Sequence, residues 1–117
     1  TTPEHQAFLK AYQDKYKDHP RLGSVVGYTA IQSLAAGMRK AGGADTEKLI
    51  TAFRGLELTS PFGPIRYRTE DHQSTMGAFV GKTRNEGGKG VMVNFRYADG
   101  AKFQPSAEEV KKLRAAD

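Results

Sequence analysis

Apolar residues recur at helical spacing through the first half of the chain and at alternate positions through much of the second half. Over residues 3–17 the aromatic side chains stand four positions apart, which is the period of one helix face, at Phe8, Tyr12 and Tyr16. Thr2 is a hydroxyl cap before this segment, and Pro3 suits the first helical position, where its missing N–H group costs nothing. Pro20 ends the segment, because the residue before a proline avoids the helical region.

A second helix is predicted from Ser24, as its cap, to about Ala41, because Gly42 follows the last periodic residue. Its larger apolar residues fall along one side, at Val26, Ala30, Ile31, Leu34 and Met38. Small residues on its other sides permit close neighbours. We therefore expect this helix to be buried on more than one face.

A third, short helix is predicted after Asp45 or Thr46, either of which serves as its cap, and Gly55 ends it. Its apolar residues are Leu49, Ile50 and Phe53. Residues 60–64 contain two prolines and a glycine, which fix a rigid corner. A brief strand over residues 65–68 is expected after that corner.

The second half of the chain carries the alternation of β-strands. Small and large side chains alternate over residues 76–83, and Gly77 and Gly81 indicate a bend or the close approach of a neighbouring backbone. Residues 85–90 are the expected hairpin loop. Residues 91–97 form the clearest strand, with one face made by Val91, Val93, Phe95 and Tyr97.

Two local signals follow these strands. The pair Asp99 and Gly100 is typical of a two-residue hairpin turn. Ser106 with Glu109 predicts a capping box that opens a last helix, running to about residue 114. The residues expected to pack on its apolar side are Val110 and Leu113.

Composition bounds the class of protein. At 117 residues the chain suits one small domain or part of a larger one. Its net charge of +5 makes nucleic acid a partner to test, but the basic residues are scattered and most lie near acidic ones, which is typical of a solvated surface. The lack of cysteine excludes disulfides and thiolate catalysis, and it fits cytosol and periplasm equally. The sequence contains no run of about 18 apolar residues, so no membrane span is predicted.

No residue pattern points to catalysis or to a metal. The three histidines, at 5, 19 and 72, are far apart and lack a carboxylate at ligand spacing. His72 follows Asp71, but neighbours in an extended segment point to opposite faces, so a turn or a local hydrogen bond is its expected role. The glycine-rich residues 85–90 lack the spacing of a phosphate loop and precede a strand rather than a helix. We expect no enzyme activity, no cofactor and no metal.

Four segments together resemble a known family, and they are residues 8–16, 27–38, 62–68 and 71–77. In this order and at these spacings they resemble the C-terminal part of the type I periplasmic solute-binding proteins of bacterial ABC importers. Within that family the resemblance is to the Leu/Ile/Val-binding-protein-like, branched-chain amino acid type. It covers nearly the whole chain.

The resemblance implies an α/β fold of two lobes joined by three crossovers, with the ligand closed between the lobes. This chain would be the last third of such a protein: three helices, then antiparallel strands and a short terminal helix. Residues 1–74 would belong to the N-terminal lobe, residues 75–80 would form the third hinge crossover, and residues 81–117 would belong to the C-terminal lobe. Neighbours from elsewhere in that protein would then cover the second helix.

The resemblance also implies functional residues. The family has an aromatic ligand contact just before the second helix, where this chain has Leu22, Gly23 and Ser24, and these are the expected ligand-binding residues. The missing aromatic leaves room in the pocket and favours a bulkier aliphatic or aromatic acid over a plain branched-chain amino acid. His72 would fix the backbone where one lobe meets the other. The hinge itself would include Thr75, Met76, Gly77 and Phe79.

By this resemblance the chain would belong to a periplasmic, non-enzymatic receptor of an uptake system. Its partners would be an amino acid or other carboxylate ligand and a membrane permease, with no nucleic acid, and the isolated chain would self-associate through exposed apolar faces. Two alternatives remain open. One is a self-contained basic α+β module that contacts RNA through Arg66, Arg68, Arg96 and the loop lysines, and the other is a hydrolase or transferase, for which the sequence offers no nucleophile.

Overall fold

The computed structural model describes residues 2–114, and it combines helices with antiparallel strands as the sequence predicts. Strand β1 pairs with β2, and β3 pairs with β4, in two separate antiparallel sheets. The elements run in the order α1 (Pro3–Tyr16), α2 (Leu22–Ala41), α3 (Thr46–Phe53), β1 (Glu57–Ser60), β2 (Gly63–Arg66), β3 (Ala78–Glu86), β4 (Lys89–Ala98), the 3-10 turn η1 (Gly100–Lys102) and α4 (Ala107–Leu113).

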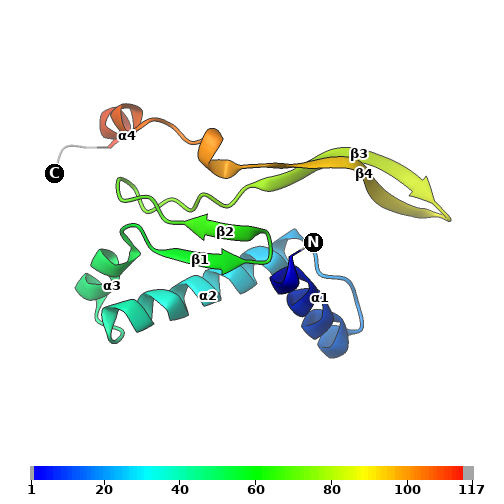
Figure 1. Cartoon of the computed structure of the whole chain (residues 1–117), viewed down its shortest axis with the longest axis horizontal. Helices are drawn as coiled ribbons and strands as arrows, with labels where there is room; N and C mark the ends of the chain where they lie inside the picture. Colours follow the sequence, from blue (N-terminus) through cyan, green and yellow to red (C-terminus); the bar gives the residue numbers. More distant parts are fainter. Residues whose placement is uncertain (1, 115–117) are drawn as a thin grey trace.

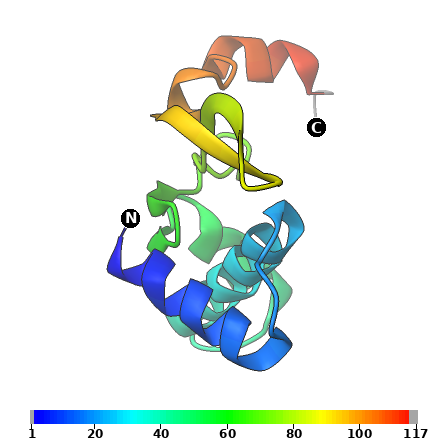
Figure 2. The ribbon, with the colours of Figure 1, turned by 90° about the vertical axis from the view of Figure 1, so that its right-hand side faces the viewer.

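The molecule is long and forms two tiers. The first three helices and the β1–β2 hairpin make one tier, while the β3–β4 hairpin and α4 make the other and extend past it at one end (Figures 1 and 2). The extents are 55 × 32 × 21 Å and the radius of gyration is 17.0 Å, whereas a compact domain of this length has about 13 Å. The surface of 8608 Å² likewise exceeds the roughly 6,300 Å² typical of a compact monomer of this mass. The two tiers therefore share little core.

Local caps explain where the first two helices begin and end. The Thr2 hydroxyl accepts the His5 N–H at 3.1 Å, so the predicted cap of α1 is confirmed. Helix α2 begins at Leu22 rather than after Ser24. Ser24 is its third residue, and its hydroxyl reaches back to accept the Arg21 N–H at 3.3 Å. The predicted end is right, since Gly42 follows Ala41 with a φ of +73°.

The buried face of α2 is not the one that its apolar stripe predicts. The helix turns Val25, Thr29, Ser33 and Gly37 toward its neighbours in the same tier. The hydroxyls of Thr29 and Ser33 donate to the carbonyls of Val25 and Thr29, each at 2.8 Å, so their burial leaves no donor unpaired. Small side chains permit this close contact, whereas the larger ones face outward, namely Val26, Ile31, Leu34 and Met38.

The β1–β2 hairpin is tighter than predicted. Gly63 and Pro64 belong to β2, and the strand ends at Arg66, so the corner is reduced to two residues. Beyond it, Tyr67 bridges to Ser74 across a turn. The predicted turn role of His72 is confirmed, because its N–H donates to Arg68 O at 3.0 Å and its φ is +57°.

The β3–β4 hairpin carries a bulge that changes the predicted faces of β4. The register shifts between Val80 and Lys82, and Asn94 on the opposite strand has a φ of +50°. Because a bulge inserts one residue, the side chains after it alternate in the opposite phase to those before it. Met92 therefore shares a face with Phe95, and the expected single face through Val91, Val93, Phe95 and Tyr97 is wrong. The predicted loop over residues 85–90 narrows to Gly87 and Gly88.

The Asp99–Gly100 hairpin signal was also wrong. Asp99 instead caps η1, since its carboxylate accepts the Ala101 N–H at 3.1 Å. The capping box of α4 is confirmed, with Ser106 and Glu109 bonded to each other's backbone N–H groups. Val110 is buried as expected, but Leu113 is exposed.

Candidate ligand cleft

A cleft lies between the helical tier and the β3–β4 hairpin. It contains a cavity of about 420 Å³, which adjoins one of about 310 Å³. Both are open to solvent and mostly apolar. The larger is lined by His5 and Phe8 from α1, by Pro20, Arg21, Leu22 and Val25 around the start of α2, by Phe62, and by Ala78, Phe79 and Met92 from the hairpin.

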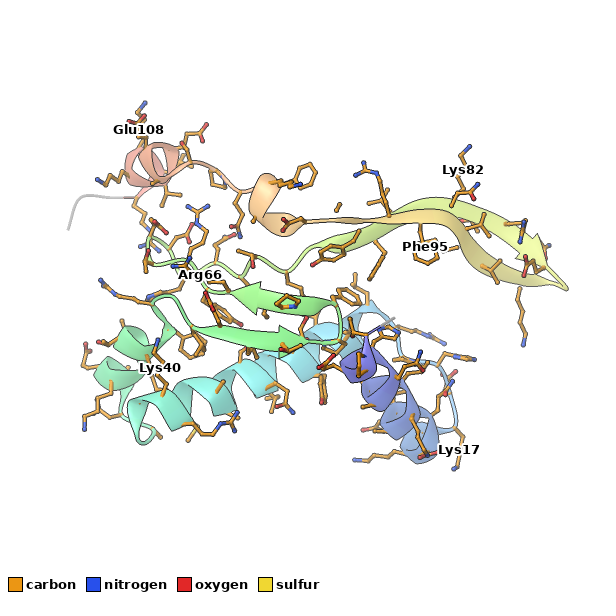
Figure 3. All side chains as sticks on the ribbon, in the orientation of Figure 1. Lys17, Lys40, Arg66, Lys82, Phe95 and Glu108 are labelled. Atoms are coloured by element: carbon orange, nitrogen blue, oxygen red, sulfur yellow. The ribbon has the colours of Figure 1, made fainter. Side chains whose placement is uncertain are left out.

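Aromatic side chains from both tiers meet in this cleft. The rings of His5 and Phe62 stack at 6.5 Å between centroids, and Phe62 meets Phe79 edge-on at 5.2 Å. Phe79 in turn meets Phe95 edge-on at 5.8 Å. Figure 3 shows Phe95 pointing from the hairpin toward the helices and Lys82 pointing away. The hairpin thus turns its aromatic face to the helical tier.

The position of Phe62 follows from the tight β1–β2 turn. The Ser60 hydroxyl donates to Gly63 O at 2.8 Å and accepts the Phe62 N–H at 3.1 Å. Gly63 has a φ of +105°, a conformation that side-chain-bearing residues rarely adopt. The Thr2 hydroxyl also donates to Pro61 O at 3.3 Å, which ties the start of α1 to the turn. These bonds hold the Phe62 ring over the cleft.

Of the three predicted ligand-binding residues, Leu22 lines the cleft, whereas Gly23 and Ser24 follow it in α2 and line neither cavity. Leu22 lines the larger cavity and is 72% exposed. Gly23 has no atom within 4 Å of the point where a Cβ would stand, so the rim of the cleft is open there. Ser24 is half-buried and its hydroxyl is engaged by the Arg21 N–H. The first turn of α2 contains no acidic residue, which leaves the positive end of the helix dipole uncompensated.

The predicted hinge residues join the two tiers. Thr75 belongs to the helical side, because its N–H donates to Arg66 O and its hydroxyl accepts the Arg66 N–H, both at 2.9 Å. Two residues later, the Gly77 N–H donates to the Tyr97 hydroxyl at 2.7 Å. Met76 is the single residue between these attachments. Phe79 stands in β3 and faces the cleft.

An ionic cluster lies in the turn just before this crossover. Arg68 Nε is 3.3 Å from Asp71 Oδ1, and the side chains are 15% and 9% exposed. The pKa of Glu70 is lowered from its usual 4.5, first because its carboxylate accepts its own backbone N–H, then by the Thr69 hydroxyl and the Arg68 charge. His72 Nε2 is buried without a hydrogen-bond partner within residues 2–114. The turn is thus built around buried polar contacts rather than apolar ones.

Two of the three arginines proposed for RNA contact, Arg66 and Arg68, lie within ion-pair distance of an acidic side chain, and the Arg66 side chain is still 58% exposed. Arg66 lies 3.8 Å from Glu57, and Arg68 is largely buried. Arg96 is exposed on the hairpin. Within the described chain, no group of three or more His, Cys, Asp or Glu side chains is arranged to hold a metal ion, and no helix is long and apolar enough to cross a membrane.

Several cleft residues were missed by sequence reasoning. His5 was considered only as a metal ligand, and Met92 was not included in the face predicted for residues 91–97. Phe62 had a signal, because its rigid turn flanked by prolines was recognisable. The others come from separate elements, so nothing local in the sequence indicates that they meet.

Residues 1–101 match the model of a protein family described as "Periplasmic binding protein". The chain belongs to this family. The resemblance noted in the sequence is therefore confirmed, together with the α/β fold class. A curated relative from Pseudomonas aeruginosa, the leucine-, isoleucine-, valine-, threonine- and alanine-binding protein, is 31% identical over 65 residues, or 56% of this chain.

Solved structures of ABC transporter proteins from Rhodopseudomonas palustris share the fold. One, described as an ABC-type branched-chain amino acid transporter, has a TM-score of 0.79 and 25% identity over 87% of this chain. Another is the solute-binding protein of an ABC transporter in complex with 3,4-dihydroxybenzoic acid, with a TM-score of 0.74 and 26% identity over 85% of this chain. The chain spans 17% of the curated relative and 28% of each of these two structures.

Proposed function

We propose that this periplasmic binding protein chain forms part of the extracytoplasmic solute-binding component of an ABC uptake system. Its solutes would be branched-chain amino acids or related aliphatic or aromatic acids, and its second partner would be a membrane permease. Its role is to bind solute rather than to convert it, as for its relatives. The observation that carries the proposal is the apolar cleft of about 420 Å³ between the two tiers, a size suited to a small organic ligand.

In this proposal the two tiers belong to different lobes. Residues 1–74 contribute to one lobe, residues 75–80 form a hinge crossover, and residues 81–117 contribute to the other. The change of attachment between Thr75 and Gly77 supports this division. Ligand would bind between the lobes and shift the population toward the closed arrangement. The long shape and the exposed apolar side of α2 agree with packing against further parts of such a receptor.

The lining of the cleft supports a ligand with an apolar or ring-shaped body and an acidic group. Phe62, Phe79 and Phe95 offer edges and faces on which a ring or a branched chain packs. Gly23, near the position of the family's aromatic contact, leaves the rim open, because nothing lies within 4 Å of the point where its Cβ would stand. The start of α2 has no acidic residue in its first turn, so the helix dipole favours a carboxylate on this side, and Arg21 stands beside it with its guanidinium 3.7 Å from the Asp18 carboxylate.

The test is a calorimetric titration of the full-length protein that carries this chain. Leucine, isoleucine, valine and 3,4-dihydroxybenzoate are the ligands, and glucose is the control. We expect saturable binding of at least one acid and none of glucose. Binding of none of the acids would contradict the proposal, and binding of only the three branched-chain amino acids would contradict the preference for a bulkier acid.

A pair of variants locates the binding site. Phe79→Ala removes a cleft ring, and the matched change Val80→Ala alters the neighbouring side chain, which is on the opposite face of β3 and 51% exposed. Burial of a phenylalanine side chain is worth about 1.5–3 kcal/mol, and 1.4 kcal/mol is a factor of ten. We expect Phe79→Ala to weaken binding about tenfold or more and Val80→Ala to leave it unchanged. Equal losses would show that the ligand binds elsewhere.

A further inference from the structure

After the β3–β4 hairpin the chain returns to the turn from which it departed. Gln104 Nε2 donates to Ser74 O at 2.8 Å, across 30 residues of sequence. Arg68 Nη1 donates to Pro105 O at 2.7 Å, across 37 residues. Both tiers are visible side by side at this end, with α4 next to the turn that precedes β3 (Figures 1 and 2). The segment after the hairpin is therefore bonded to the segment before it.

Helix α4 adds a third attachment. Arg114 Nη1 donates to Glu70 O at 3.2 Å, and its Nη2 lies 3.5 Å from Asp71 O. Each of these four bonds joins a side chain on one segment to a backbone carbonyl on the other. Such bonds require both backbones to be in place, because a carbonyl cannot rotate toward its donor as a side chain can.

The crossover itself is enclosed by the returning strand. A Cβ on Gly77 would overlap Ala98 O. A Cβ on Gly100 would lie 2.6 Å from Met76 O and 2.7 Å from Thr75 O, closer than van der Waals contact permits. The two glycines thus let the outgoing and returning backbones touch where the hairpin leaves the helical tier. The crossover is a pair of adjacent backbone segments, and its returning half is residues 98–100.

We propose that residues 104–114 form a strap that ties the returning half of the crossover to the turn at residues 68–74. The strap limits the orientations that the β3–β4 hairpin adopts relative to the helical tier. Gln104, Arg68 and Arg114 are its positioning residues, and none of them lines the cleft. This inference rests on the proposed function only where it concerns solute: a restrained hairpin needs less ordering when ligand binds between the tiers, so the strap raises affinity.

The test is hydrogen exchange of the 117-residue chain in the absence of solute, followed by mass spectrometry. Gln104→Ala removes one neutral bond without leaving a buried charge, and Gln6→Ala, an exposed change on α1, is its matched control. A second variant ends at residue 103 and lacks the strap altogether. We expect up to about tenfold faster exchange at residues 76–79 and 97–100 in Gln104→Ala, because one hydrogen bond contributes on that scale. The shortened chain should show a larger effect at the same residues.

The exchange pattern decides between a strap and a general structural role. Unchanged exchange at residues 76–79 and 97–100 in both variants overturns the proposal. Faster exchange spread evenly over α1, α2 and β1 also overturns it, because the strap predicts an effect confined to the crossover. Since no solute is present, either result is independent of the proposed function. A titration of the full-length protein with its solute then measures whether the strap raises affinity. We expect weaker binding for Gln104→Ala and unchanged binding for Gln6→Ala.

Discussion

Two glycines in α2 offer a direct test of how this helix packs in the helical tier. Gly37 faces Phe53 of α3, and a methyl group at its Cβ position would lie 2.5 Å from the Phe53 Cε2 atom. The ring has little freedom to move away, because it packs edge-on against Tyr67 at 5.0 Å. Gly27 lies in the same helix, and a Cβ there would meet no atom within 4 Å. The two positions therefore differ in packing but not in helical context.

The magnitudes follow from that difference. Replacing an interior helical glycine by alanine gains about 1 kcal/mol at both positions. Overpacking at Gly37 costs about 1–3 kcal/mol, so Gly27→Ala should stabilise the chain and Gly37→Ala should leave it unchanged or less stable. The helical gain cancels in the comparison, and the free energies of unfolding should differ by about 1–3 kcal/mol. In a chain of this size that separates the melting temperatures by about 4–12 °C.

The assay is urea unfolding followed by far-ultraviolet circular dichroism at low protein concentration. Relative to the unsubstituted chain, the urea midpoint should rise for Gly27→Ala. For Gly37→Ala it should stay the same or fall. Adding Phe53→Leu to Gly37→Ala should recover part of the loss, because the smaller side chain gives room to the new methyl group. Equal midpoints for the two alanine variants would refute the close contact of α2 with α3.

Three further outcomes are expected. Gly77→Ala should destabilise the chain by about 1–3 kcal/mol, because its Cβ meets the backbone oxygen of Ala98, whereas Gly90→Ala should cost far less in the same urea assay, since it meets only a methyl carbon at 3.6 Å. Hydrogen bonds from Ser106 lower the pKa of Glu109 from its usual 4.5. The stabilisation of α4 by the Glu109 carboxylate is therefore present above pH 4.5 and is lost as pH falls through the lower folded pKa. The ¹³Cα shifts of α4 should follow this loss, and in Glu109→Gln they should be insensitive to pH over the same range. Leu34, 43% exposed on the apolar side of α2, should support self-association of the isolated chain, so Leu34→Lys should lower the weight-average mass in sedimentation equilibrium.

The local elements were largely predictable because their signals are local. The cap at Thr2, the end of α2 at Gly42 and the capping box of α4 each depend on residues within about one helical turn. The family resemblance was also available from the sequence, because it rests on the order and spacing of short segments. The domain boundaries and the hinge residues remain proposals.

The faces of the elements were harder to predict than their positions. In α2 the apolar stripe marks a surface that favours burial, but the side in contact with β1 and α3 is the one with small residues, since these let the backbones approach. In β4 a single bulge at Asn94 reverses the alternation. Neither effect is visible in hydrophobic periodicity, because each depends on what lies across the contact.

Short-range patterns in the sequence predict the helices, the β3–β4 hairpin and the family, whereas the β1–β2 hairpin was expected only as a rigid corner followed by a brief strand. Which residues meet in the cleft depends on the tertiary structure, since His5, Phe62, Phe79 and Phe95 come from four separate segments. The tertiary structure also decided that Gln104 and Arg68 close the chain around its crossover. Contacts between residues 30 or more positions apart depend on the path of the backbone, and no local pattern carries that information.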